Sequence, residues 1–186
     1  MIPLLRSVLL ALAFLCLAGQ SAGRGQVLRV GTAPTRQQQQ LSLNTLTVSS
    51  SPSTVSFALS NGKSSTGSAP VSITTSWLLG VASTVRLYGF FSSSVALTST
   101  GSDGTTIPAS SIQGQCPTGT PTSLTPFTQA GPFGGANSLL LFQQSATVSL
   151  LVTRTDQLSL VIDLSSLPQL PAGTYSGTLT LQAQAM

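Results

Sequence analysis

Two residue types that carry much of the chemistry of enzyme active sites are missing from this sequence. It contains no histidine and no glutamate, and its only acidic side chains are Asp103, Asp156 and Asp163. Without histidine there is no usual general base, no Ser-His-Asp triad and no imidazole zinc ligand. Paired-carboxylate catalysis would need two of the three aspartates, and Asp156 and Asp163 flank one predicted strand instead of converging. The sequence therefore predicts a protein without enzymatic activity, cofactor or metal ion.

The few charged groups that remain each have a structural interpretation. Lys63 follows an Asn-Gly turn and is expected at a solvated hairpin tip, although a Ser-Lys dyad is conceivable. Asp103 in "GSDG" is typical of a turn, with a weak calcium contact as the alternative. Asp163 is expected to accept bonds from backbone or hydroxyl groups near a sheet edge, and Arg154 and Asp156 are expected to form an exposed pair.

Charge is scarce overall, since only 5% of the residues are charged. Globular domains are ordinarily about a quarter charged, so hydroxyl and amide groups must solvate this surface. Three of the seven basic residues, Arg24, Arg29 and Arg36, fall within residues 24–40, which we interpret as a flexible, mildly basic, Gln-rich arm. Basic residues this sparse, without interleaved aromatics, argue against nucleic acid as a partner.

The first 23 residues are expected to be a secretory signal peptide. Arg6 precedes an apolar run from about residue 8 to residue 18, and small residues follow at Ser21 and Gly23. This run is shorter than the roughly 20 residues that cross a bilayer, so no integral membrane segment is expected after cleavage. Cys16 would leave with the signal, so Cys116 is the single mature cysteine. It is interpreted as a partly buried loop residue, with a redox-labile thiol or a bond to another chain as alternatives.

From residue 41 onward the sequence alternates apolar and hydroxyl residues, which is typical of β-strands. "SNGK" predicts a hairpin turn at Asn61-Gly62. "STVRLYGFFSS" is apolar on both faces, which predicts a central or covered strand. In the second half, "SLLLFQQSATVSLLV" and "QLSLVIDLSS" are interpreted as two strands separated by a turn at "TRTD". One predicted face, on "APVSITTSWLL", consists of Val71, Ile73, Thr75 and Trp77.

Residues 98–138 are dense in Gly, Pro, Ser and Thr and predict long loops with one or two short strands. No convincing amphipathic helix is present. Residues 41–186 are therefore predicted to form one all-β domain, an antiparallel immunoglobulin-like β-sandwich of roughly seven to nine short strands.

The closing segment, "LPAGTYSGTLTLQAQAM", resembles the last strand of bacterial pilin-like domains of the spore-coat-U and chaperone-usher type. In those domains a "P-x-G-x-Y" turn leads into an alternating strand, with a glycine fourteen residues from the end and an aromatic at the penultimate position. Gly173 matches the glycine, whereas Ala185 replaces the aromatic, and the cysteine pair common in those subunits is missing. The assembly strand that this resemblance implies comprises Gly173, Tyr175, Leu179, Leu181, Ala183 and Ala185.

The resemblance implies an incomplete sandwich that pairs with a strand from another subunit, with main-chain hydrogen bonds giving affinity. The donor would be the segment after the signal, where Leu28 and Val30 alternate in "QVLRVGT". The expected function is thus that of a secreted, non-enzymatic structural or surface-interaction protein, periplasmic or on a bacterial cell surface. Its partners would be copies of itself or other surface subunits.

The alternative is a stand-alone extracellular module that binds a ligand, with glycans as the obvious candidate. It would use the loops of residues 98–138, where Phe127 and Phe133 offer stacking faces beside neutral hydroxyl groups.

Overall fold

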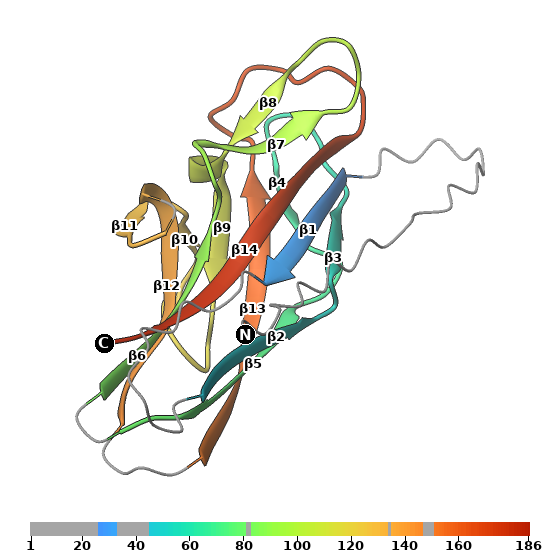
Figure 1. Cartoon of the computed structure of the whole chain (residues 1–186). Helices are drawn as coiled ribbons and strands as arrows, with labels where there is room; N and C mark the ends of the chain where they lie inside the picture. Colours follow the sequence, from blue (N-terminus) through green and yellow to red (C-terminus); the bar gives the residue numbers. More distant parts are fainter. Residues whose placement is uncertain (1–25, 33–44, 81–82, 134, 147–150) are drawn as a thin grey trace, which may run out of the picture.

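The computed structural model describes residues 26–32, 45–80, 83–133, 135–146 and 151–186. The predicted signal peptide, residues 1–23, lies outside these residues. The described chain is an all-β sandwich of two sheets packed face to face (Figure 1). This confirms the predicted all-β sandwich. The described strands number fourteen instead of seven to nine, because the loop region contributes several strands of two to four residues.

The first sheet has eight strands, in the order β11-β12-β6-β14-β1-β3, with β7 pairing with β14 and β8 with β7. Its strands are β1 (Gln26–Thr32), β3 (Thr54–Phe57), β6 (Ser83–Phe90), β7 (Val95–Ser99), β8 (Thr106–Pro108), β11 (Gln129–Gly131), β12 (Gly135–Ala146) and β14 (Tyr175–Ala185).

The second sheet has six strands, in the order β10-β9-β13-β5-β2, with β4 also pairing with β13. Its strands are β2 (Thr45–Ser51), β4 (Ser64–Thr66), β5 (Val71–Leu78), β9 (Ile112–Gln115), β10 (Thr125–Pro126) and β13 (Leu151–Asp163), and one 3-10 turn, η1 (Ala109–Ser111), precedes β9.

Alternation along β5 shows how composition produces this architecture. Val71, Ile73, Thr75 and Trp77 point inward and are buried, as predicted, and the Trp77 ring stacks on Phe142 with centroids 6.0 Å apart. On the outer face, hydroxyl pairs bridge neighbouring strands. Thr74 and Thr155 are 3.1 Å apart and Ser76 and Thr153 2.9 Å apart between their oxygens. Cross-strand hydroxyl bonds of this kind let a surface with few charges stay solvated and still favour extended backbone.

The apolar second face of β6 is covered, as its sequence predicts. β6 lies between β12 and β14 in the first sheet. Tyr88 on its outer face is buried against the ring of Phe133, which meets it edge-on at 6.0 Å. Phe133 belongs to the turn between β11 and β12, so this hairpin shields the outer face of a central strand.

Two turns predicted from the sequence have different roles in the structure. Gly62 adopts a φ of +69°, and Lys63 N donates to Ser60 O at 3.2 Å, so the Asn-Gly turn is confirmed. It does not make a hairpin, however, because β3 and β4 on either side belong to different sheets. The prediction of a turn at "TRTD" is wrong, since residues 153–156 lie inside β13 and pair with residues 73–76 of β5.

Candidate functional site

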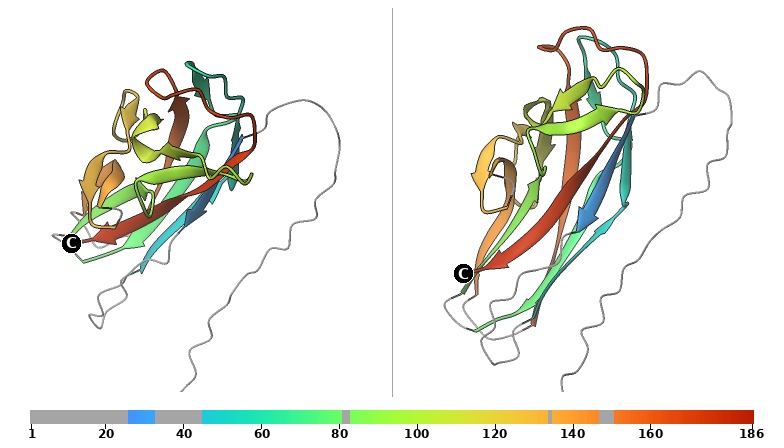
Figure 2. Two further views of the ribbon diagram at one scale, coloured as in Figure 1. Left: turned by 90° about the horizontal axis from the view of Figure 1, so that it is seen from above. Right: turned by 45° about the horizontal axis from the view of Figure 1, so that its top comes forward.

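β1 fills the space between β3 and β14 in the first sheet (Figures 1 and 2). Residues 26–29 pair with β3 antiparallel, while residues 27–32 pair with β14 in parallel. This is the one parallel pairing among the described strands. The prediction of a flexible arm over residues 24–40 is therefore wrong for residues 26–32, whereas the rest of that arm lies outside the described residues.

The side chains of β1 complete the core. Leu28 is fully buried and Val30 is 5% exposed, while Arg29 between them points outward and is exposed. Leu28 lies opposite Gly177 of β14 and Val55 of β3, so its side chain fills the core between those two strands. Without β1, the facing edges of β3 and β14 would expose unpaired backbone groups, and the core would be open between these strands.

The assembly residues proposed from the C-terminal motif lie on β14 or immediately before it. Gly173 is exposed in the preceding turn, and Ala185 is half-buried near the strand end. The inward-facing members, all buried in the core, are Tyr175, Leu179, Leu181 and Ala183.

Tyr175 anchors the turn that leads into β14. Its ring is 1% exposed, and its hydroxyl donates to the carbonyl oxygen of Pro171 at 3.2 Å. Burial raises the pKa of this phenol above its ordinary value, mainly by desolvating the charged form. A tyrosine at the start of a strand that bonds back to the backbone a few residues upstream is a recurring corner of sandwich folds, where it marks the strand before the last.

The two phenylalanines predicted as binding residues have different environments. Phe127 is fully buried between the sheets and meets Phe91 edge-on at 5.2 Å, so its proposed role as an exposed stacking face is wrong. Its ring fits because Gly89 and Gly114 leave room, since a Cβ at either position would lie 3.2 Å from it. Phe133 is half-buried and lies over the outer face of the first sheet.

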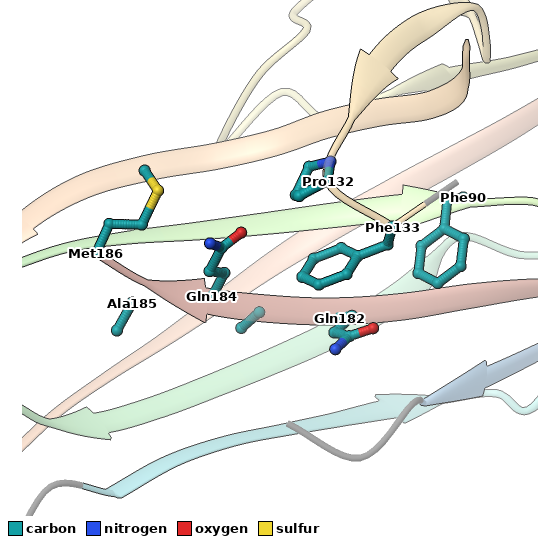
Figure 3. A pocket seen from close by; sticks show the side chains of 8 residues that line it. Phe90, Pro132, Phe133, Gln182, Gln184, Ala185 and Met186 are labelled. Carbon is teal, nitrogen blue, oxygen red and sulfur yellow. The ribbon is translucent and has the colours of Figure 1, made fainter. Parts of the chain in front are cut away.

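Phe133 forms one wall of a cavity of about 700 Å³ beside the end of β14. Its ring stacks on that of Phe90 with centroids 5.7 Å apart and planes at 30°. Figure 3 shows these two rings side by side, with Gln182, Gln184 and Met186 along the neighbouring strand. Phe90, Gln182 and Gln184 were not predicted as site residues. Strand alternation indicates which residues share a face, but not that a hairpin distant in the sequence covers them.

A second polar cluster lies at the other sheet, around Asp156. The Asp156 carboxylate is 1% exposed and accepts bonds from Arg154 Nε at 2.7 Å and Nη2 at 2.8 Å. The expectation of an exposed pair is therefore wrong. Arg154 also donates to Thr118 O and lies 4.8 Å above the Phe142 ring centroid. The bond to Asp156 raises the pKa of Arg154, and the cluster clamps the loop of residues 116–121 onto β13.

Cys116 borders this cluster and is fully buried as a free thiol. Desolvation and, secondarily, the charge of Asp156 raise its pKa. Since the thiolate is the reactive form, Cys116 is a packing residue in this conformation.

The remaining aspartates make local bonds. Asp163 accepts from Ser165 N at 3.0 Å and from Ser64 Oγ at 3.2 Å, which confirms its predicted partners. The backbone bond from Ser165 is the main cause of its lowered pKa. Asp103 accepts from Thr105 Oγ1 at 3.1 Å, and its pKa is lowered chiefly by a bond from Ser99. Within the described ranges, no group of three or more acidic or cysteine ligands could hold a metal ion.

No described helix is both long and apolar enough to cross a membrane. Comparison with protein-family models and with curated proteins finds no match to this chain. Two features of the described chain point to a function: the position of β1 between β3 and β14, and the cavity beneath Phe133.

Proposed function

We propose that the protein is a secreted, non-enzymatic structural subunit that assembles with copies of itself, or with other surface subunits, by β-strand addition. The single observation that carries this proposal is the position of β1. It is a short strand at one end of the described chain, yet it fills a full slot between β3 and β14.

A strand in this position can be exchanged without rearranging the rest of the sandwich. β1 is followed by residues 33–44 before β2 begins, so its connection to the domain is long. A chain of this length can span up to about 40 Å when extended. The equivalent segment of a second copy would offer the same backbone bonds and the same two buried side chains, which is the physical basis of strand swapping.

The tyrosine corner supports the same interpretation. In immunoglobulin-like sandwiches this corner marks the strand before the last, and one more strand then pairs with it. Here β14 carries the corner, and β1 occupies the position beside it in the sheet. An immunoglobulin-like sandwich that takes its closing strand from elsewhere is what the resemblance of "LPAGTYSGTLTLQAQAM" to pilin-like subunits implies.

A cysteine pair across β1 and β14 tests whether this strand is exchanged. Arg29 and Thr178 face each other in the register and both side chains are exposed. Neighbouring strands lie about 4.8 Å apart, within reach of a disulfide. In a Cys116→Ser background, oxidised Arg29→Cys/Thr178→Cys protein from its host should form a ladder of covalent multimers on a non-reducing denaturing gel.

The matched control places the pair within the body of the sandwich. Ser76 and Thr153 also face each other in the register, on β5 and β13. The Ser76→Cys/Thr153→Cys protein should give only monomer, because both strands stay in one chain. If the Arg29/Thr178 pair also gives only monomer at every protein concentration, β1 closes its own sandwich and the assembly proposal fails.

A further inference from the structure

The cavity beneath Phe133 lies on the outer face of the first sheet, apart from the core that β1 completes. We infer that it is a binding site for an uncharged saccharide. This inference does not depend on subunit assembly, because the aromatic wall of the cavity comes from β6 and from the β11–β12 turn.

The size and lining of the cavity fit a small sugar. A volume of about 700 Å³ lies within the range of roughly 300–1,000 Å³ that ligand sites occupy. Phe90 and Phe133 line the cavity, and their apolar surface there can pack against the C–H groups of a pyranose. None of the lining side chains carries a charge, so a charged ligand would lose its hydration without gaining an ion pair.

Two glutamines supply the polar contacts. A primary amide offers two donors and an acceptor, which matches vicinal hydroxyl groups. Gln182 is 6% exposed and lines the cavity. Gln184 is half-buried and makes no side-chain hydrogen bond within the part of the chain that the structure describes. Its amide is half-exposed in the cavity, where a ligand hydroxyl can take the place of water as its hydrogen-bond partner.

The hairpin that carries Phe133 is built to hold the ring in place. Gly131 packs so closely against β12 that a Cβ there would lie 2.6 Å from the oxygen of buried Ser138. Gly135 opens β12 with a φ of +56°, and Gln129 Oε1 accepts from Leu140 N at 2.8 Å. A preorganised aromatic loses little freedom when a ligand binds, which is why such residues serve as anchors.

The environment of Arg86 favours a neutral ligand over an acidic one. It lies opposite Gln184 in the β6–β14 pairing, next to the cavity. Its Nε donates to Gln143 Oε1 at 2.7 Å, and its Nη1 approaches the sulfur of Met186 at 4.0 Å. Arg86 is not among the residues that line the cavity, whereas a receptor for a carboxylate would have its guanidinium there.

The test is an array of neutral and acidic oligosaccharides probed with the full mature chain, followed by calorimetric titration of the best neutral binder. We expect saturable binding that weakens about tenfold or more in Phe133→Ala. Gln184→Met, which keeps the side-chain length and removes the amide, should weaken binding as well. Leu124→Ala is the control, because Leu124 is an exposed apolar residue of the same loop region that does not line the cavity.

Three results would overturn the inference. They are no saturable binding to any neutral glycan, binding restricted to sialylated or uronate glycans, and undiminished binding by Phe133→Ala with an unchanged circular dichroism spectrum. A failure here leaves the Arg29/Thr178 cross-linking result untouched, so the two proposals can be judged separately.

Discussion

Arg154 and Asp156, two residues apart on β13, form a two-point ion pair in which the carboxylate is almost wholly buried and the arginine is 26% exposed. Alternation puts both side chains on the inner face of one strand, so they neutralise each other where the sheet meets the loop of residues 116–121.

Removal of the arginine and removal of the aspartate should lower the free energy of unfolding by different amounts. Arg154→Ala leaves a buried carboxylate without its partner and should lower the free energy of unfolding by about 3–5 kcal/mol. Asp156→Ala leaves a partly exposed guanidinium that can reach water and should cost less. Urea unfolding of both variants and of the double variant measures this. A larger loss for Asp156→Ala than for Arg154→Ala would contradict the argument.

The Cys116 thiol should be inert in the folded protein. Because it is buried and its pKa is raised, a thiol reagent such as DTNB at pH 8 should label it only after denaturation. Ser123→Cys, at an exposed position, is the matched control and should add one fast-reacting thiol per native chain. Rapid labelling of Cys116 in the native state would show that the loop of residues 116–121 opens.

Removing the Tyr175 hydroxyl should destabilise the corner that precedes β14. Tyr175→Phe loses the bond to Pro171 O and should cost about 1 kcal/mol at neutral pH. The folded state holds this proton more tightly than the unfolded chain, whose phenol has a pKa of about 10. The contribution of the phenol is therefore complete below that pH and is lost as the pH rises through the folded pKa.

Denaturant unfolding of wild type and Tyr175→Phe between pH 7 and pH 11 tests this sign. The wild-type advantage should shrink above about pH 10. An advantage that grows over the same interval would mean that the phenolate, not the phenol, is the form favoured in the folded protein.

Truncating Leu28 should loosen β1 before it unfolds the sandwich. Leu28→Ala removes a fully buried side chain, a change that costs about 2–5 kcal/mol in a rigid core. Because Leu28 anchors β1 to the core, we expect faster hydrogen exchange on residues 176–181 of β14, which pair with β1, and little change on the β6–β12 pairing. Thr32→Ala, at an exposed position on the same strand, is the control.

Much of the sandwich could be predicted from sequence, since β5 alternates cleanly and Trp77 falls in phase with its buried neighbours. The errors have physical causes. "TRTD" has the composition of a turn, but Arg154 and Asp156 satisfy each other within a strand. Phe127 looked exposed among polar loop residues because the room made by Gly89 and Gly114 comes from distant strands.

β1 was predicted as a donor strand from the alternation of only two residues, Leu28 and Val30, and both are buried. Its partners lie elsewhere in the sequence, and alternation shows which face a residue takes but not which strand lies beside it. The cavity escaped prediction for the same reason, because its aromatic wall and its amides come from three separate segments.

The pairing of β1 with β14 also sets an order of events for a chain that leaves the ribosome from its N-terminus. Leu28 meets Gly177, so a further 149 residues must be made after Leu28 before this contact can form. Until then the first strand has an empty neighbouring position and an apolar side chain in water. Contacts this distant in sequence are slow to form and leave edges exposed to other chains. A holding factor that binds the first strand, or another copy that reaches it first, would therefore compete directly with closure of the chain on itself.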